Sequence, residues 1–352
     1  MGVGQFEERK RDHIRHALDS SSQAEGATGL DALVLPHEAL PDLDFAEVSL
    51  EEPCLGRLMA TPFYISGMTA GHSDAVEINR RLALACAERG WGMGVGSQRR
   101  QLDHPEAPEL DQWAEIRRQA PALVLFGNVG IAQVIGVPVD RLRRLVDTLE
   151  AQALCVHLNP LQEALQPEGT PNFKGALVAL EKLCQSLEVP VVLKETGCGI
   201  SRATLRRLKN IGLAAVDVAG LGGTHWGRIE GARAREQAGG EKQFKASLTF
   251  ANWGIPTAEA VTAAKDSLSS TTEVWASGGV RSGLDAAKLV SLGANRIGFA
   301  RPALEAALDG PDAIQKWMDL QEFELKVALF CTGSKDPAEL RRKGEEWKRS
   351  ES

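Results

Sequence analysis

The chain has 352 residues, of which 43% are hydrophobic and 25% are charged, so it can bury a large core. Its net charge of −7 excludes a general nucleic-acid binder, because such proteins need a basic surplus to neutralise phosphates. The six cysteines form no CxxC pair, and no apolar run approaches the roughly 20 residues that span a bilayer. With a charged N-terminus that lacks an apolar signal core, these features predict a soluble, cytoplasmic protein with reduced thiols.

Residues 1–62 are predicted to form an extension outside the main domain. Residues 9–18 (RKRDHIRHAL) have helical potential with a basic face, and residues 20–29 are small and polar, which predicts a mobile segment. Taken alone, the charges of residues 9–18 indicate a solvated helix face rather than a binding surface. Residues 43–58 alternate enough to supply one or two strands.

From Pro62 onward, short apolar runs alternate with segments of helical periodicity. Near-continuous apolar runs are typical of parallel strands that are covered on both faces. Eight such units favour a closed (β/α)8 barrel over an open sheet, and no GxGxxG turn follows the first run to indicate a dinucleotide-binding domain. We therefore expect an α/β TIM barrel over residues 63–310 and a helical tail over 311–352. The predicted strands cover residues 63–68, 91–96, 122–128, 153–159, 190–195, 214–220, 273–279 and 295–300.

Polar or glycine-rich residues follow every predicted strand. In a (β/α)8 barrel the carboxyl ends of the strands meet at one mouth, where the chemistry collects. One polar strand end is ordinary, but eight of them favour an active-site rim. In chain order the ends carry Met68 and Thr69; Ser97, Gln98 and Arg99; Asn128; His157, Asn159, Gln162 and Glu163; Lys194 and Glu195; Thr224; Gly278, Gly279 and Arg281; Ala300 and Arg301.

The fourth strand end, residues 157–163, carries the densest set of polar groups. Its imidazole, two amides and carboxylate offer hydrogen-bond donors, acceptors and a hard oxygen ligand. Glu163 is the strongest metal candidate, because Mg²⁺ takes one or two protein carboxylates together with waters and substrate phosphates. A magnesium site of this kind predicts a phosphorylated substrate. A polar surface loop with a structural glutamate is the alternative.

Two other strand ends predict a phosphate site. The pair Gly278 and Gly279 and the residues around Arg301 each precede a predicted helix, where backbone N–H groups and the positive helix end can hold phosphate. A tight turn is the alternative explanation for a glycine pair. Lys194, at the end of an apolar strand, predicts a cationic contact to an anionic cofactor, with a Schiff-base lysine as the alternative.

These motifs together resemble the type II isopentenyl-diphosphate isomerases, a flavin-dependent family. The resemblance runs from Arg9 to Arg301, and the combination of HLNPLQE, QPEG and KETGCGIS is highly specific, whereas GGVR and GFAR would fit any FMN barrel. The other matching motifs are RKRDHI, PFYISGMTAG, MGVGSQR, NFKG, GLGGTHW, WGIPTAEA and ASGGVRSGLDAAKLVSLGA.

The resemblance implies a barrel with FMN at its mouth, a Mg²⁺-bound diphosphate substrate held above it and NADPH as the reductant of the flavin. It implies catalytic roles for Gln162 and His157, and Glu163 as the metal ligand. It also implies an N-terminal arm that reaches a neighbouring subunit in a homo-oligomer, a tetramer or octamer. The implied substrate contacts are Arg9, Lys10, Ser97, Gln98, Arg99, His157, Asn159 and Gln162. The implied FMN contacts are Gly67, Met68, Thr69, Ser97, Asn128, Lys194, Thr224, Gly278, Gly279, Arg281, Ala300 and Arg301.

The implied reaction interconverts isopentenyl and dimethylallyl diphosphate. It adds a proton to one carbon and removes one from another without net redox change, and N5 of a reduced flavin can serve as the acid and base. The chain departs from the family pattern at Ala70, Thr170, Ala219 and His225. The last two departures concern flavin contacts, and all four leave the substrate and metal set intact.

Two other hypotheses remain open. An FMN-dependent 2-hydroxy acid oxidase or dehydrogenase needs a histidine base beside an arginine that holds the substrate carboxylate, and His225 with Arg228 partly imitates that pair. Such an enzyme would not need Gln162, Glu163 or Mg²⁺. A catalytically silent scaffold would lack the polar residues of the rim, which are present.

Overall fold

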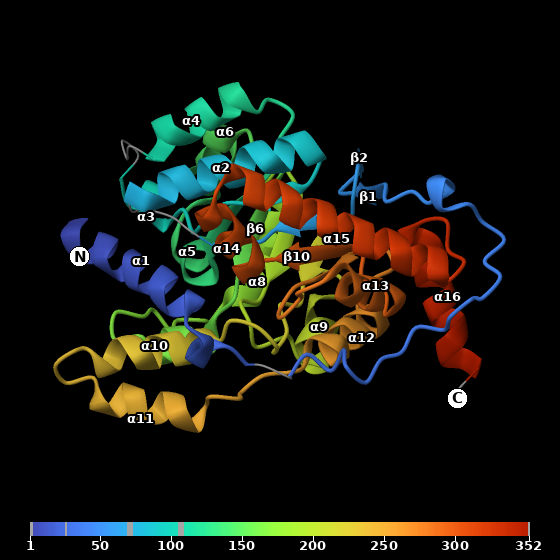
Figure 1. Cartoon of the computed structure of the whole chain (residues 1–352). Helices are drawn as coiled ribbons and strands as arrows, with labels where there is room; N and C mark the ends of the chain where they lie inside the picture. Colours follow the sequence, from blue (N-terminus) through green and yellow to red (C-terminus); the bar gives the residue numbers. More distant parts are fainter. Residues whose placement is uncertain (1–2, 25–26, 69–72, 105–108, 351–352) are drawn as a thin grey trace.

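A closed barrel of parallel strands forms the centre of the molecule (Figure 1). The computed structural model describes residues 3–24, 27–68, 73–104 and 109–350. Within these ranges eight strands close in the order β10, β3, β4, β5, β6, β7, β8, β9, which confirms the predicted (β/α)8 barrel. The strands are β3 (Phe63–Ile65), β4 (Gly92–Gly94), β5 (Val124–Gly130), β6 (Ala153–His157), β7 (Val191–Lys194), β8 (Ala215–Asp217), β9 (Glu273–Ala276) and β10 (Arg296–Phe299).

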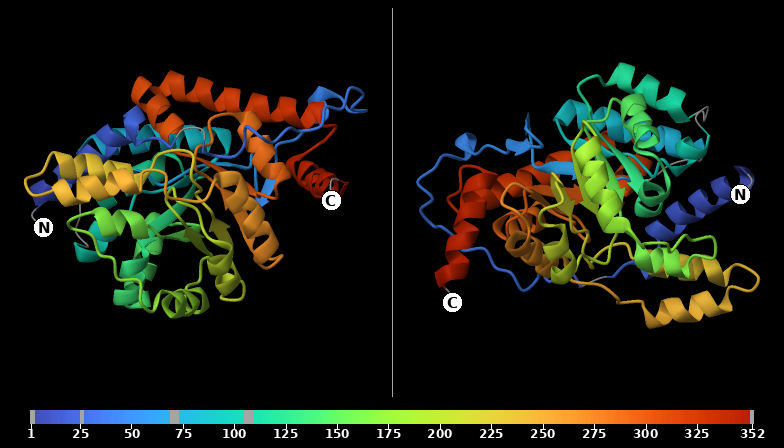
Figure 2. Two further views of the ribbon diagram at one scale, coloured as in Figure 1. Left: turned by 90° about the horizontal axis from the view of Figure 1, so that it is seen from below. Right: turned by 180° about the vertical axis from the view of Figure 1, so that it is seen from behind.

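Most of these strands are shorter than the apolar runs that predicted them, because the last residues of each run leave the sheet and form the rim of the mouth. Helices surround the barrel on its outer face, as Figure 2 shows in two further views. The helices that follow the strands are α2 (Ser73–Arg89), α4 (Glu109–Gln119), α6 (Val139–Leu149), α8 (Ala176–Ser186), α9 (Arg202–Leu208), α12 (Thr257–Ser267), α13 (Gly283–Ser291) and α14 (Arg301–Asp309).

Further helices lie at the start of the chain, at the mouth and at the end of the chain. The pair α10 and α11 packs side by side and extends from the barrel next to α1, and α15 and α16 pack against α14 and α13. These additional helices are α1 (Val3–Leu18), α3 (Arg99–Asp103), α5 (Ile131–Gly136), α7 (Pro160–Leu165), α10 (Trp226–Arg235), α11 (Glu241–Thr249), α15 (Pro311–Cys331) and α16 (Pro337–Ser350). None of the helices in the described ranges is long and apolar enough to cross a membrane.

Aromatic side chains fill the barrel interior. Tyr64 and Trp275 lie 5.0 Å apart between ring centroids, and Phe126 lies 5.1 Å from Trp275. All three residues are almost completely buried and come from β3, β9 and β5. Burying one such ring stabilises the fold by about 2–3 kcal/mol, so this cluster gives the mouth a rigid floor.

A short hairpin closes the opposite, N-terminal end of the barrel. It consists of β1 (Glu52–Cys54) and β2 (Arg57–Met59), which confirms the strands predicted within residues 43–58. The backbone N–H of Leu55 donates to Glu273 at the start of β9, over 2.7 Å. Arg296, at the start of β10, donates to the carbonyl oxygen of Glu52 over 2.6 Å. The hairpin is thereby fixed to the strand starts.

The N-terminal segment lies against the mouth of its own barrel. Helix α1 contacts α10 and α14 of the same chain, and Figure 1 shows it beside α10. The described residues within 20–29 do not form the free segment that their composition predicted. They include a 3₁₀ turn at Ser20–Ser22 and a β-bridge from Gln23 to Thr224. Small polar residues are seated here because the barrel offers them backbone partners.

Candidate active site

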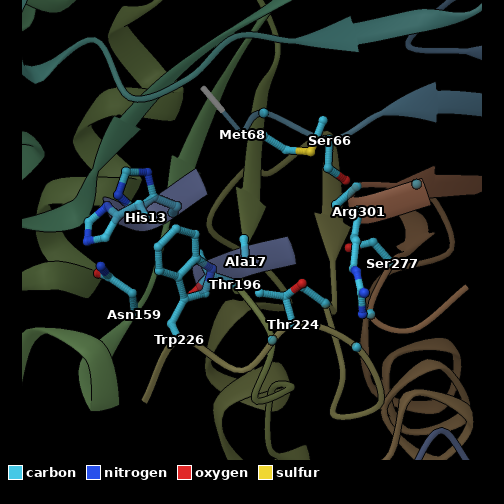
Figure 3. A pocket seen from close by; sticks show the side chains of 18 of the residues that line it. His13, Ala17, Ser66, Met68, Asn159, Thr196, Thr224, Trp226, Ser277 and Arg301 are labelled. Carbon is cyan, nitrogen blue, oxygen red and sulfur yellow. The ribbon is translucent and has the colours of Figure 1, made fainter. Parts of the chain in front are cut away.

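One cavity of about 530 Å³ opens at the carboxyl ends of the barrel strands. Figure 3 shows that side chains of α1, among them His13 and Ala17, enter the same space as the strand-end residues. The structure therefore brings together nearly all of the residues that the sequence predicted. The predicted residues that line the cavity are Lys10, Gly67, Met68, Ser97, Arg99, Asn128, His157, Asn159, Gln162, Glu163, Lys194, Thr224, Gly278, Gly279, Arg281, Ala300 and Arg301.

Gln98 is an exception, because its side chain lies beneath the rim and not in the cavity. It is buried, its amide oxygen accepts from the backbone N–H of Asn128, and its amide nitrogen donates to Gln101. In this position Gln98 supports the loop that carries Asn128, and its contact with the substrate stays a prediction. The side chain of Arg9 and the whole of Thr69 lie outside the described residues.

The residues after β6 form a hydrogen-bonded network. The amide nitrogen of Asn159 donates to Gln162 over 2.9 Å and to Glu163 over 3.0 Å. The other carboxylate oxygen of Glu163 accepts the backbone N–H of Thr170 over 2.5 Å. Pro160 begins α7, where it leaves no helical N–H unsatisfied, so the turn between strand and helix is short and stiff. This turn aims Gln162 and Glu163 into one cavity.

A buried carboxylate stands behind Gln162. Glu230, on α10, is completely buried and accepts a hydrogen bond from the amide nitrogen of Gln162 over 2.9 Å. It also pairs with Arg233 over 2.5 Å and lies 3.0 Å from Nε2 of His13, which comes from α1. Arg233 is in turn held by Glu168 over 2.9 Å. The cluster joins α1, α7 and α10 at one side of the cavity.

The charges in this cluster follow from burial and pairing. Burial alone would raise the pKa of Glu230, but the hydrogen bond from His13, the charge of Arg233 and the amide of Gln162 lower it to about 2. Burial lowers the pKa of His13, against its hydrogen bond to Glu230. Glu230 is therefore an anion at neutral pH, and His13 is a neutral donor to it.

His157 is a neutral imidazole of defined tautomer. The amide nitrogen of Asn128 donates to the carbonyl oxygen of Val95 over 3.0 Å, so its amide oxygen faces Nδ1 of His157 at 2.9 Å. Nδ1 must then carry the hydrogen, which leaves Nε2 as an acceptor. Burial lowers the pKa of His157 to about 3, and the charges of Lys194 and Lys10 add to this effect.

Lys194 stands at the floor of the cavity. Its ammonium donates to the carbonyl oxygen of Glu195 over 2.6 Å and lies 3.8 Å from the buried carboxylate of Asp217. Glu195 is not merely a counter-charge, because one of its oxygens accepts the backbone N–H groups of the three residues that follow it, at 2.6 to 2.7 Å. The loop after β7 is therefore held in one conformation beside the fixed ammonium of Lys194.

The predicted phosphate turns have the backbone shape that such a site needs. Gly278 and Gly279 have φ angles of +103° and +78°, and a Cβ atom on Gly278 would lie 2.1 Å from the carbonyl oxygen of Gly220. Only glycine fits there. Arg281 and Arg301 flank the turns, with Figure 3 showing Arg301 beside Ser277. The turns also precede α13 and α14, whose N-terminal ends favour anions.

The His225 and Arg228 pair is not available for chemistry in the cavity. His225 is completely buried, its Nδ1 accepts the backbone N–H of Arg228 as the N-cap of α10, and its Nε2 lies 3.1 Å from the carbonyl oxygen of Trp253. The guanidinium of Arg228 is held by Ala251, Asn252 and the backbone of Ser21. Both side chains thus serve to fasten the start of α10.

Comparison with known proteins decides the family. Residues 156–345 match the model of the FMN-dependent dehydrogenase family. An isopentenyl-diphosphate delta-isomerase of Legionella pneumophila (strain Corby) is 53% identical over 339 residues, covering 96% of this chain and 97% of the relative. An enzyme of the same name from Bdellovibrio bacteriovorus is 52% identical, and the match covers 96% of this chain and 97% of the relative. One from Stutzerimonas stutzeri is 43% identical, and the match covers 95% of each chain. The chain belongs to the FMN-dependent, type II isopentenyl-diphosphate delta-isomerases.

Solved structures of more distant proteins share the architecture of this type II isomerase chain. A mandelate oxidase with a monooxide FMN adduct aligns with a TM-score of 0.66 at 18% identity and covers 97% of this chain and 98% of its own. A flavocytochrome b2 with benzoylformate aligns with a TM-score of 0.68 at 20% identity and covers 96% and 82%. At these identities the likeness shows the fold alone.

Three residues of the cavity and its supporting cluster stand out among those that were missed from the sequence. His13 and Trp226 both lie within motifs that carried the resemblance, RKRDHI and GLGGTHW, and their rings meet edge to face at 5.1 Å. Figure 3 shows them side by side at one end of the cavity, near Asn159. Glu230 follows the second motif by four residues, and a charged residue on a helix carried no signal of burial.

Proposed function

We propose that the chain interconverts isopentenyl diphosphate and dimethylallyl diphosphate by a 1,3-proton shift that requires reduced FMN and Mg²⁺. The observation that carries this proposal is that one cavity joins the HLNPLQE network to the glycine turns. The HLNPLQE network offers a carboxylate and two amides beside cations, and the glycine turns offer a cradle for a phosphate. A small diphosphate and a flavin can therefore share one water-poor space.

The residues present fit FMN. The cradle at Gly278 and Gly279 has no room for Cβ atoms, Arg281 and Arg301 supply positive charge beside it, and Lys194 places an ammonium at the floor. When bound and reduced, the flavin would supply the acid and base for the proton shift. Met68 and Thr224 also line the cavity and would contact the ring system of the flavin.

The substrate diphosphate would bind at the opposite side of the cavity. Lys10, Arg99 and His157 all line it there, and Asn159 and Glu163 complete the polar wall. Glu163 would contribute one carboxylate to Mg²⁺, and the diphosphate and waters would supply the other ligands. The described residues contain no group of three or more His, Cys, Asp or Glu side chains that could hold a metal ion, so an ion here would depend on the diphosphate for most of its ligands.

The protein groups near the reacting carbons would orient the substrate and exclude water, and they would not themselves change charge. Gln162 is fixed at both ends of its amide, since its oxygen accepts from Asn159 and its nitrogen donates to Glu230. These two bonds hold the N–H groups of the Gln162 amide in one orientation near the substrate. Ile14, Ala17 and Trp226 cover the cavity with apolar surface. Such a wall excludes water, which would otherwise capture a cationic intermediate.

The 2-hydroxy acid oxidase hypothesis is disfavoured by the position of its candidate base. His225 does not line the cavity and has both ring nitrogens engaged by the protein backbone. Arg228 is likewise bound to backbone and amide oxygens away from the cavity. The likeness to mandelate oxidase therefore concerns the barrel and not its chemistry.

The deciding experiment is an anaerobic isomerase assay. Purified protein that shows a flavin spectrum is reduced with NADPH, given isopentenyl diphosphate with and without Mg²⁺, and analysed for dimethylallyl diphosphate. We expect product only with reduced flavin and Mg²⁺ together. If protein with bound, reduced flavin forms no dimethylallyl diphosphate, the isomerase proposal is wrong. Oxidation of mandelate or lactate would favour the oxidase hypothesis instead.

We also propose that the chain works as a cytoplasmic homo-oligomer, a tetramer or octamer, as the family resemblance implies. The described part of α1 contacts its own barrel through His13 and Glu230. Contact of the arm with a neighbouring subunit stays a prediction. Light scattering coupled to size exclusion would measure the mass, and a monomer at micromolar concentration would contradict this part of the proposal.

A further inference from the structure

The N-terminal segment crosses the turn between Leu221 and Thr224 and pairs with it through backbone hydrogen bonds. The backbone N–H of Ala24 donates to the carbonyl oxygen of Gly223 over 2.8 Å. In return, the backbone N–H of His225 donates to the carbonyl oxygen of Ser22 over 2.9 Å, and Gln23 pairs with Thr224 as an antiparallel bridge. We call residues 22–24 and 27–28 the strap. Its backbone clamps a turn that lines the cavity.

The side chain of Gln23 reaches the cavity from the strap. Gln23 is 5% exposed and lines the cavity beside Thr224. Its amide nitrogen donates to the carbonyl oxygen of Ala17 over 3.0 Å, at the end of α1. The hydroxyl of Thr224 lies 3.3 Å from both the oxygen and the nitrogen of the same amide. Gln23 therefore fixes the hydroxyl of Thr224 and connects it to α1.

Thr28 seats the other end of the strap on the glycine turns. A Cβ atom on Gly222 would lie 2.2 Å from the methyl group of Thr28, and one on Gly279 would lie 2.7 Å from it. The carbonyl oxygen of Thr28 accepts the backbone N–H of Ala258 over 2.9 Å. Since Gly279 belongs to the proposed phosphate cradle, the strap packs directly against the turns that would hold the phosphate.

Arg301 adds a second link between the cradle and the same segment. Its guanidinium donates to the carbonyl oxygen of Leu18 over 3.0 Å and to Glu305 over 2.8 Å. The arginine that flanks the phosphate turns thus also holds the end of α1, which leads into the strap. Motion of the strap and occupation of the cradle must affect each other through these shared contacts.

We infer that the strap retains the phosphate end of the flavin and that Gln23 is a positioning residue for the flavin contact of Thr224. This inference rests on the flavin site proposed above. Release of the flavin requires the strap to lift, because its backbone and Thr28 hold the turns that form the cradle. Conversely, a bound flavin stabilises the strap, since linkage between two equilibria is reciprocal.

The test measures flavin release from the holoenzyme. Wild type, Gln23→Ala and the control Ser20→Ala, at an exposed position of the same segment, are diluted, and the return of free-flavin fluorescence is followed. Loss of the amide removes its hydrogen bonds to Ala17 and Thr224, which corresponds to roughly tenfold faster release. Ser20→Ala is expected to match wild type, and thermal melting of the three apoproteins to agree within a few degrees.

Hydrogen exchange on the wild-type chain gives an independent measurement that needs no variant. Amides of Ala24 and His225 are expected to exchange several-fold more slowly when flavin is bound. Unchanged release from Gln23→Ala, or unchanged exchange in the strap of wild type, overturns the inference even when the enzyme is active. Wild-type protein that binds no FMN would instead overturn the proposed flavin site itself. Should Gln23→Ala fail to fold, the exchange measurement alone decides.

Discussion

The amide nitrogen of Gln162 and the carboxylate of Glu230 lie 2.9 Å apart, although the two residues are 68 positions apart in the chain. This contact joins α7, which follows the fourth strand of the barrel, to α10, which follows the sixth. Because Glu230 is an anion held by Arg233, it accepts only, and so it determines which end of the Gln162 amide faces it. The orientation of Gln162 is set from behind the cavity.

Glu230→Gln is expected to lower kcat by about 100-fold while flavin remains bound. The neutral amide can accept or donate, so it no longer fixes the amide of Gln162, and positioned proton transfer typically contributes about 10²-fold or more. Steady-state kinetics with the reduced enzyme and the flavin absorbance of the same sample measure the two effects. Glu241→Gln, an exposed substitution on α11, is the matched control. If the Glu230→Gln enzyme were fully active, the carboxylate of Glu230 would have no role in the reaction.

Glu163→Gln is expected to abolish turnover that depends on Mg²⁺ and to leave flavin binding unchanged. The amide keeps the size of the side chain and can accept one of the two hydrogen bonds that Glu163 receives from Asn159 and Thr170, but it is a much poorer ligand for a hard cation. Activity is measured across a Mg²⁺ titration with the flavin content fixed. Glu181→Gln, on the exposed face of α8, controls for the loss of one negative charge. Wild-type activity with a normal Mg²⁺ response would exclude Glu163 from the metal site.

His157 is expected to make the protein less stable as the pH falls from about 6.5 to about 3. Its pKa is lowered to about 3 in the folded protein, whereas an unfolded histidine titrates near 6.5, so the unfolded state binds the extra proton in this window. The free energy of unfolding should fall there by about 4 kcal/mol from this residue.

Urea unfolding of wild type and His157→Asn between pH 4 and pH 7 measures this contribution. The variant keeps a donor for the amide oxygen of Asn128 but cannot titrate, so its stability should depend less on pH. His13 and His225 have lowered pKa values as well, because of burial, and they leave a residual slope in the variant. His37→Asn, at an exposed position, is the control. Parallel curves for wild type and His157→Asn would contradict the prediction.

His225→Asn is expected to retain isomerase turnover within about threefold, because an asparagine side chain can also cap the N-terminus of α10. His225→Ala should lose about 1 kcal/mol of stability with the cap. Kinetics and chemical unfolding of both variants test this pair of outcomes. If His225→Asn lost 100-fold or more in kcat with flavin bound, His225 would have a chemical role and the oxidase hypothesis would return.

Much of the fold could be predicted because the barrel is built from local repeats. Each strand is a short apolar run and each helix has its own periodicity, so the eight units are visible one at a time. The rim could be predicted for a related reason, since a strand end is found from the strand itself. Gln98 shows the limit, because its position after a strand did not reveal that its side chain turns inward to Asn128.

The arm and the cluster around Glu230 could not be predicted from local pattern. His13 and Glu230 are 217 residues apart, and neither lies at a strand end. A charged helix such as α1 has the composition of a solvated surface, and only the motif RKRDHI indicated otherwise. Likewise, residues 22–24 pair with the turn at Gly223 through two backbone hydrogen bonds and one bridge, which no local pattern indicates.

The hairpin of β1 and β2 has a consequence for the order of events in the barrel. Because the hairpin covers the far end and aromatic side chains fill the interior, the cavity of the described structure lies at the mouth, beside α1 and the strap. If the flavin occupies the proposed cradle above this filled interior, the substrate would have to bind on its outer side, after the flavin. Each catalytic cycle would then exchange only the substrate, while the flavin stays bound between cycles.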